Sequence, residues 1–138
     1  MTQEDKKLLL KDLCARLPYG VKFACNKNVY TAKGLDLIVT DEGNWEYAVT
    51  AKGIAPIEID FIKPYLFPLS SMTEEQKREY NFWKHEVFVC HYEYGDVVEE
   101  IELYDSPESF EYLIENHFDY HGFIPMGLAL DATGLNIY

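Results

Sequence analysis

Basic residues are absent from the last 54 of the 138 positions of this chain. No lysine or arginine follows Lys84, whereas twelve acidic residues lie between Glu86 and Asp131. The first 84 residues hold twelve basic and twelve acidic residues, so the formal net charge of −12 belongs to the C-terminal part. Because contacts to phosphate need cations, this absence argues against direct nucleic-acid binding by the C-terminal part. A surface of one charge sign instead attracts basic molecules over about 8 Å in physiological salt.

Long apolar runs and cysteine are also scarce. No stretch has the roughly 18 apolar residues that a membrane span needs, and the N-terminus lacks a basic segment followed by an apolar one. We therefore expect no membrane span, no secretory signal and a cytoplasmic protein. The three cysteines, Cys14, Cys25 and Cys90, form no C-x-x-C pair, which predicts reduced thiols that serve as small core residues.

The common catalytic motifs are missing as well. The sequence contains no G-x-G-x-x-G, no P-loop and no G-x-S-x-G, so the frequent nucleotide-binding and hydrolase classes are not indicated. Cys90 and His91 are neighbours on a predicted strand, so their side chains point to opposite faces and cannot form a nucleophile–base pair. We expect no cofactor, and an enzymatic role only as an alternative.

Apolar and aromatic residues, in contrast, are plentiful. They make up 48% and 15% of the chain, with eleven tyrosines and eight phenylalanines. An acidic disordered tail would be poor in aromatics, so the acidic part should fold. The length fits one domain or two closely packed halves.

The N-terminal part predicts an α-helix followed by a small antiparallel sheet. Thr2 is suited to cap a helix over residues 3–17, in which apolar residues recur every three or four positions before Pro18 and Gly20. Short runs rich in β-branched and aromatic residues then alternate with turn residues, at positions 21–25, 29–32, 35–39, 45–49 and 57–61. This pattern indicates a five-strand antiparallel sheet, which could close into an SH3-like barrel.

The second half predicts a helix, a β-hairpin and another helix, which makes the fold class α+β. The helices are expected at residues 74–84 and 107–117, and the strands at 86–94 and 97–103. Gly95 and Asp96 suit the centre of a type II′ turn, which would pair Phe88 with Leu103, Cys90 with Ile101, and His91 with Glu100. The apolar tail after Gly122 should be an ordered loop or short strand.

A proline-bounded segment joins the two halves. Tyr65, Leu66 and Phe67 lie between Pro64 and Pro68, which predicts a connector that packs against both halves. We therefore divide the chain into residues 1–69 and 70–138 and expect one shared core. The residues expected to be buried are Leu9, Leu13, Leu17, Val21, Phe23, Leu37, Val39, Ile57, Ile59, Phe61, Phe82, Phe88, Ile101, Leu113 and Phe118.

Three segments resemble a known family. They are DKKLLLKDLCARLPYGV at 5–21, KPYLFPLSSMTEE at 63–75, and HFDY at 117–120 with Gly122. Over roughly a third of the chain they are similar to an uncharacterised family of gut Bacteroidales and their phages. No activity or functional residue is established for that family, so the resemblance implies none here. Similar proteins carry Arg at position 121, which weighs against a metal site that needs His121.

A divalent-metal site is the sharpest enzymatic hypothesis. His117 and His121 are four residues apart, so a continuous helix would place both imidazoles on one face, near Glu115 or Asp119. The sequence lacks the H-E-x-x-H arrangement, however, and Gly122 indicates that the helix is ending. Surface histidines among acids are the competing interpretation.

Protein interaction is the main functional hypothesis. A rigid array of carboxylates can bind a basic partner, and mimicry of DNA is one form of this; a solvated acidic face that only maintains solubility is the alternative. The N-terminal aromatics Tyr30, Trp45 and Tyr47 could also bind a peptide or a strand, although core positions are the usual role of such residues. The candidate partner-binding residues are Glu93, Asp96, Glu99, Glu100, Glu102, Asp105, Glu108, Glu111 and Glu115.

Overall fold

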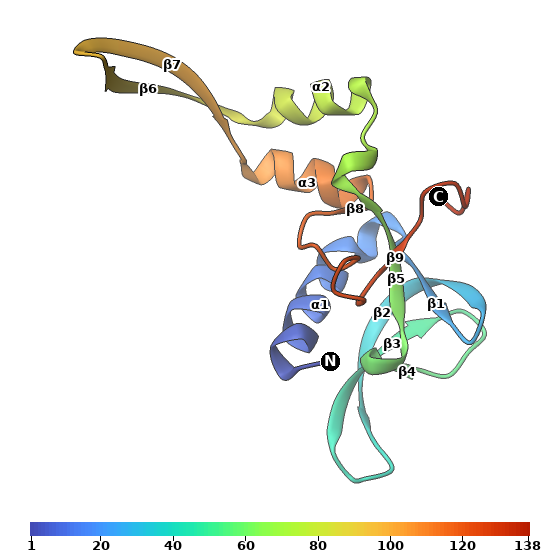
Figure 1. Cartoon of the computed structure of the whole chain (residues 1–138). Helices are drawn as coiled ribbons and strands as arrows, with labels where there is room; N and C mark the ends of the chain where they lie inside the picture. The colour runs from blue at the N-terminus through green and yellow to red at the C-terminus, as the bar shows by residue number, and fades with distance from the viewer. The chain divides into compact units, whose positions relative to one another are not determined.

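The computed structural model describes residues 1–138, which divide into two compact units. Unit 1 consists of residues 1–71 and 117–138, and unit 2 consists of residues 72–116. The helices and strands are coloured along the chain in Figure 1. Those of unit 1 are α1 (Gln3–Arg16), η1 (Leu17–Tyr19), β1 (Lys22–Cys25), β2 (Asn28–Val39), β3 (Trp45–Ala51), β4 (Ile57–Glu58), η2 (Ile59–Phe61), β5 (Lys63–Pro68), η3 (Leu69–Ser71), β8 (Phe118–Asp119) and β9 (Leu130–Asp131). Those of unit 2 are α2 (Glu74–Trp83), β6 (His85–Glu93), β7 (Asp96–Tyr104) and α3 (Pro107–Glu115).

Unit 1 contains a seven-stranded sheet in the order β4-β3-β2-β1-β5-β8, with β9 also paired to β5. The pairs from β4 to β5 are antiparallel, whereas β8 and β9 pair with β5 in parallel. The predicted α+β class is confirmed. The path ends at β4 and β8 without joining, so the SH3-like barrel does not close.

The N-terminal helix begins where the sequence indicates and ends one residue earlier than expected, at Arg16. The Thr2 hydroxyl accepts from the Asp5 backbone N–H at 3.0 Å, and the Asp5 carboxylate accepts from the Thr2 N–H at 3.2 Å. These two bonds form a capping box, which satisfies donors at the helix start. Gly20 has a left-handed φ of 71°, which lets the chain turn from η1 into β1.

One expectation for the sheet is wrong in detail. The predicted strands 29–32 and 35–39 form the single strand β2, which continues through a register irregularity between Ala32 and Gly34. A Cβ atom on Gly34 would lie 3.2 Å from Thr50 Oγ1, so glycine permits the close approach of β3 at this bulge. The predicted strand 57–61 is β4 followed by the 3₁₀ turn η2.

The core of unit 1 is built from both ends of its chain. α1 contributes Leu9 and Leu13, β5 contributes Leu66, and the C-terminal segment contributes Phe123 and Leu128. Because β5 is a paired strand of this unit, the segment predicted as a connector is part of the sheet. No helix has the length and apolar character needed to cross a bilayer.

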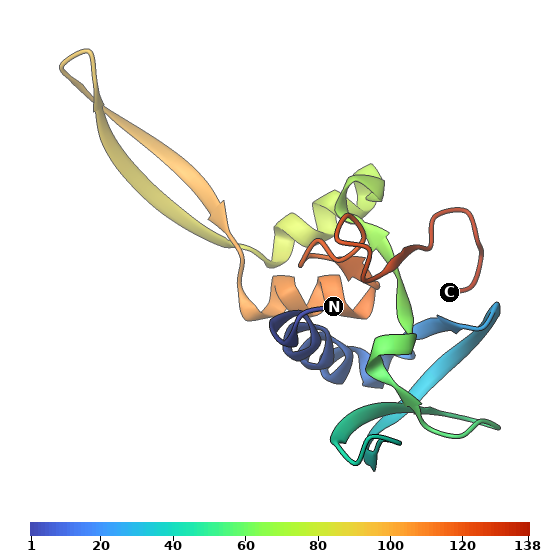
Figure 2. The same ribbon diagram turned by 60° about the horizontal axis from the view of Figure 1, so that its bottom comes forward.

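Unit 2 holds two helices and a two-stranded hairpin. Thr73 with Gln76, and Ser106 with Ser109, form capping boxes at the starts of α2 and α3. The rings of Tyr80 and Tyr112 stack between the helices, with centroids 6.3 Å apart. Figures 1 and 2 show the hairpin extending beyond the ends of α2 and α3.

The hairpin has a different turn from the predicted one. Tyr94 and Gly95 occupy its centre with φ values of 51° and 85°, so two consecutive residues are left-handed, as in a type I′ turn. Glu93 therefore pairs with Asp96, Phe88 with Ile101, Cys90 with Glu99 and His91 with Val98. The predicted register is wrong by two residues, a shift that leaves every side chain on its expected face.

Several predicted core residues are exposed. Burial is confirmed for Leu9, Leu13, Val21, Phe23, Ile59, Leu113 and Phe118, whereas Leu17 and Ile57 are half-buried. The exposed ones are Leu37, Val39 and Phe61 in unit 1, and Phe82, Phe88 and Ile101 in unit 2. Between 49% and 77% of the surface of each is exposed.

The cysteines were also expected in the core. Cys14 and Cys90 are exposed free thiols and Cys25 is half-buried, so the predicted core role is wrong for the first two.

The unit boundaries differ from the predicted division at one end. The first boundary, between Ser71 and Met72, lies two residues from the predicted one. The second boundary, between Asn116 and His117, was not predicted. Residues 117–138 belong to unit 1 because β8 and β9 pair with β5 and because Phe123 enters its core.

Candidate functional site

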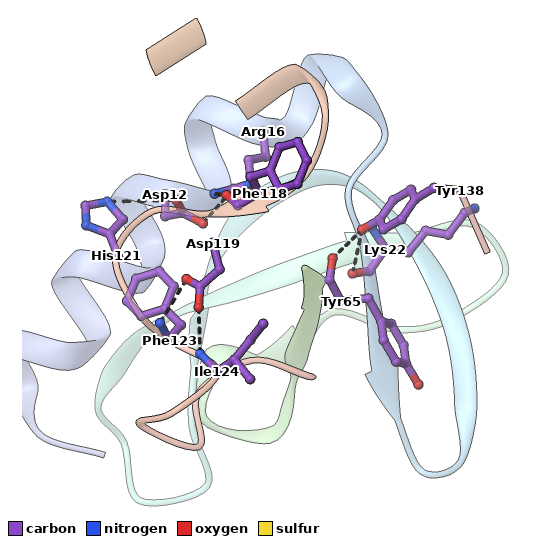
Figure 3. Close-up of polar contacts among 10 residues, drawn as sticks. All are labelled: Asp12, Arg16, Lys22, Tyr65, Phe118, Asp119, His121, Phe123, Ile124 and Tyr138. Carbon is purple, nitrogen blue, oxygen red and sulfur yellow. Dashed lines mark hydrogen bonds and ion pairs between the residues drawn. The ribbon is translucent and has the colours of Figure 1, made fainter. Parts of the chain in front are cut away.

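A buried ion pair on α1 is the most enclosed polar cluster of unit 1. Arg16 Nε donates to Asp12 Oδ2 at 2.7 Å, and Arg16 Nη2 donates to the Phe118 carbonyl at 2.6 Å (Figure 3). Neither charged side chain is exposed. The two residues lie on the same helical stripe as Leu9 and Leu13, which carries them into the core. The pair therefore ties α1 to the C-terminal segment.

Asp119 organises the loop that follows β8. Its two carboxylate oxygens accept from the backbone N–H groups of Phe123 and Ile124, each at 2.9 Å (Figure 3). His121 Nε2 lies 3.9 Å from Asp12 Oδ1. Burial raises the pKa of Asp12, opposed by the charge of Arg16, and burial also lowers the pKa of His121. This network shapes the backbone and presents no nucleophile.

Three buried side-chain atoms have no hydrogen-bond partner. They are Asp12 Oδ1, Arg16 Nη1 and His117 Nδ1. Two of them belong to the ion pair, so its hydrogen-bonding capacity is only partly used. Burying such atoms costs about 1–3 kcal/mol each, which makes this cluster sensitive to substitution.

The predicted metal pair does not form a helical site. α3 ends at Glu115, and His117 has a left-handed φ of 62°, so His117 and His121 do not lie on one helical face. The His117 ring stacks on the ring of Tyr138, with centroids 3.6 Å apart. No group of three or more His, Cys, Asp or Glu side chains is arranged to hold a metal ion.

Tyr138 secures the C-terminus against two strands. Its hydroxyl accepts from the Lys22 N–H at 2.8 Å and donates to the Tyr65 carbonyl at 2.7 Å (Figure 3). Burial raises the pKa of Tyr138 to about 12, so the phenol is neutral. Burial also lowers the pKa of His117 to about 4, and the charges of Arg16 and Lys22 act in the same direction. These rings are structural at neutral pH.

All nine acidic residues expected to bind a partner are exposed and lie in unit 2. Five are on or beside the hairpin tip and β7, Asp105 precedes α3, and the other three are on α3. Unit 2 holds thirteen acidic and three basic residues, a formal charge of −10, whereas unit 1 holds eleven and nine. The acidic surface is defined by Glu93, Asp96, Glu99, Glu100, Glu102, Asp105, Glu108, Glu111 and Glu115.

Three other C-terminal acids are not part of that surface: Glu86, which is exposed on β6, and Asp119 and Asp131, which lie in unit 1. Asp119 is buried, and Asp131 accepts from the Thr133 N–H at 2.8 Å. Hydrogen bonding from the Thr133 side chain, and then from its backbone N–H, lowers the pKa of Asp131. The Asp119 and Asp131 carboxylates both accept backbone hydrogen bonds in loops of unit 1, although Asp131 is exposed and Asp119 is buried.

The hairpin exposes an apolar face as well as carboxylates. The register places Phe88 beside Ile101 and Tyr92 beside Val97 on one face, which also holds Glu99 beside Cys90, while Glu100 and Glu102 lie on the other. Phe88 is 74% exposed and Tyr92 is 81% exposed. An isolated two-stranded hairpin is marginally stable in water, so such a face is typical of a surface that a partner covers.

The acids of α3 border a shallow depression of about 220 Å³ in unit 2. Glu108, Glu111 and Glu115 lie on one face of α3, and the depression is also lined by Trp83 and Tyr112. The Tyr112 hydroxyl donates to Glu79 at 3.0 Å. An aromatic ring beside carboxylates suits a cationic side chain.

Comparisons with known proteins add no identity. No family model, no curated protein and no solved structure matches this chain. Membership of the Bacteroidales and phage family therefore stays a prediction from the sequence.

Proposed function

We propose that this protein is an interaction module whose unit 2 binds a basic protein partner through the acidic surface. The observation that supports this proposal is the exposure of all nine carboxylates in a unit with only three basic residues, Lys77, Arg78 and Lys84. Two of these are already engaged, because Lys77 Nζ pairs with Glu74 at 3.2 Å and Lys84 Nζ lies 4.2 Å from the centre of the Tyr80 ring. The negative surface would accelerate association with a cationic partner and fix its orientation.

The apolar face of the hairpin would add affinity that charge alone does not supply. Exposed charge pairs contribute about 0–1 kcal/mol each, whereas a buried aromatic side chain at an interface can contribute 2 kcal/mol or more. Phe88, Tyr92 and Ile101 are available for such burial. The expected partner therefore presents basic residues around an apolar patch.

DNA mimicry is one form of this function. A protein that imitates DNA occupies a groove that normally contacts phosphates, so duplex DNA would compete with it. A partner that binds elsewhere would bind DNA and this protein together. The metal-dependent alternative is not carried forward, because α3 ends before His117.

The test is capture of proteins from a bacterial lysate by the full chain at about 50 and 200 mM salt. The variant E99Q/E100Q/E102Q removes three charges from β7. A matched control, E4Q/D36N/E75Q, removes the same charge from exposed positions outside the hairpin and α3. The wild-type and control proteins should capture the same basic partner at low salt, and the β7 variant should lose it.

A second variant tests the apolar contribution. F88T/I101T should weaken capture at both salt concentrations, and the binding that remains should still decrease as salt is raised. If the β7 variant captures the partner as well as wild type at both salt concentrations, the proposed function is wrong. If a partner is captured, duplex DNA is added to the complex to test mimicry. Release of the partner by DNA would support mimicry, and a complex that binds DNA and this protein together would contradict it.

A further inference from the structure

A second concave surface lies within unit 1. It is a cleft of about 770 Å³. Its walls are the first turns of α1, the turn between β2 and β3 with the strand ends beside it, and the segment around η2. This volume is in the range of sites that hold small ligands or a few peptide side chains. None of the nine acidic-surface residues lines it.

The strands give the cleft an apolar base. Leu37 pairs with Tyr47, and Val39 pairs with Trp45. Both pairs lie on the same face of β2 and β3 as the pair Leu35 and Val49, which packs in the core of unit 1. The apolar face therefore continues outward beyond the core. Trp45 is 68% exposed in this region. Phe61 of η2 lines the same cleft and is 69% exposed. Exposed aromatic rings that converge on one concavity are typical of binding surfaces.

The charged lining is predominantly acidic. Five carboxylates and two lysines face the cleft. Lys6 Nζ lies 2.8 Å from Asp60 Oδ2 and 3.2 Å from Glu46 Oε2, so it neutralises part of this charge. The other three carboxylates have no basic side chain within 4.0 Å, and they are Asp41, Glu42 and Glu58. Anionic ligands are disfavoured here and cationic ones are favoured.

We propose that this cleft binds a peptide segment that presents an arginine or lysine side chain between apolar residues. A guanidinium can stack on the face of Trp45 while a neighbouring carboxylate accepts its N–H groups. Arginine fits better than lysine because its planar head stacks on rings and donates in a fork. The apolar neighbours would contact Leu37 and Phe61. This site uses residues of unit 1 only, so it is independent of the acidic surface of unit 2.

The probe is the peptide acetyl-Leu-Arg-Leu-Arg-Leu-amide, titrated into the ¹⁵N-labelled full chain. Its neutral counterpart carries citrulline at both arginine positions, which preserves shape and removes charge. Amide shifts should appear at Leu37, Glu46, Tyr47 and Asp60, and the citrulline peptide should bind at least about tenfold more weakly. The same shifts should weaken as salt is raised.

Two variants locate the site. W45A should weaken peptide binding about tenfold, and its matched control, W83A, removes the half-exposed tryptophan of unit 2 and should leave these shifts unchanged. D41N/E42Q/E58Q should remove the salt dependence of the cleft shifts while Trp45 stays in place. Because all these positions are exposed or half-buried, the fold should persist, which the remaining amide signals report.

Several outcomes would overturn the proposal. Shifts confined to unit 2, equal binding of the citrulline peptide, or no shifts at all would each contradict it. Cleft shifts caused by maltohexaose but not by the arginine peptide would assign the aromatic base to a neutral sugar. The triple variant E99Q/E100Q/E102Q should retain the cleft shifts, so failure here is distinct from failure of the acidic-surface function.

Discussion

At the scale of single residues, Arg16 is the buried charge on which unit 1 depends. The variant R16M should lower the free energy of unfolding by about 3–5 kcal/mol, because it leaves Asp12 as an uncompensated buried carboxylate. The Phe118 carbonyl also loses its donor. Urea unfolding followed by circular dichroism measures the change. K11M, an exposed neighbour on α1, is the control and should change stability by less than about 0.5 kcal/mol.

The double variant D12L/R16M separates charge from packing. Removing both charged groups avoids the buried carboxylate, so this protein should be more stable than R16M alone. If R16M were as stable as wild type, the ion pair would contribute nothing and the network around Phe118 would be incidental.

His117 should make stability depend on pH. Its pKa falls from 6.5 to about 4 on folding, mainly because the ring is buried. Folding therefore favours the neutral ring, and this stability is fully present above pH 6.5 and lost as the pH falls toward 4. The loss is at most about 3 kcal/mol. The variant H117N should show a smaller decrease in unfolding free energy across this interval, measured by urea unfolding at several pH values.

Asparagine suits this test because it tolerates the left-handed φ of 62° at position 117. Comparing two proteins at each pH removes effects that both share. One of these is the titration of Asp12, whose raised pKa increases the free energy of unfolding as the pH falls. Parallel pH profiles for wild type and H117N would show that His117 does not titrate with folding.

At the scale of elements, the turn of the β6–β7 hairpin is strained at one position. Tyr94 has a φ of 51°, a conformation that costs a residue other than glycine about 1 kcal/mol or more. The variant Y94N creates an Asn-Gly turn, which prefers this geometry. We expect amide hydrogen exchange in β6 and β7 to slow by about fivefold, which corresponds to roughly 1 kcal/mol.

G95A is the opposite change at the same turn. Gly95 has a φ of 85°, so alanine there should speed exchange in the same strands. Exchange rates of α1 amides in unit 1 serve as the internal control. Faster exchange in Y94N would show that the hairpin does not have this turn.

The hairpin also shows how far the sequence predicts an element. Gly95 indicated a turn and the alternating pattern indicated two strands, but glycine was expected first in the turn rather than second. Tyrosine is rarely left-handed, so the pattern favoured the wrong turn type. The faces were predicted correctly, while burial of Phe88 and Ile101 was not. Alternation reveals which residues share a face and does not reveal whether another element covers it.

The buried network was predictable in part. Asp12 and Arg16 are spaced three and seven residues from Leu9, on its helical stripe, which is a sequence signal for a paired charge in the core. The role of Asp119 depends on the loop to Ile124, and the stacking of His117 depends on Tyr138. The Asp119 contacts span only four and five residues of one loop, whereas the His117–Tyr138 stack joins distant parts of the chain that no local pattern brings together.

At the scale of the whole molecule, the chain is one unit inserted into another. The sequence located the first boundary from Pro68 and the cap at Thr73, because both are local signals. It missed the second, because the return of residues 117–138 to β5 is a long-range pairing. Unit 2, the inserted segment 72–116, carries a formal charge of −10, and unit 1 carries −2. The negative charge is therefore concentrated in one of the two units.

This arrangement predicts that unit 1 folds without unit 2. Every member of its buried core cluster lies within residues 1–71 or 117–138, including Leu9, Leu66 and Phe123. Replacing residues 72–116 with a flexible Gly/Ser linker of about ten residues should therefore leave a cooperative thermal transition and the native amide signals of β1 to β5.

The isolated segment 72–116 should behave in the opposite way. Its buried apolar residues are only Met72, Tyr112 and Leu113, and 45 residues with so small a core are marginal without a staple or a partner. Its like charges also repel each other at low salt. Circular dichroism should show little structure in this peptide and no cooperative melt. A folded segment 72–116 together with an unfolded linker variant would reverse the assignment, and would show that the acidic unit is the stable body of the molecule.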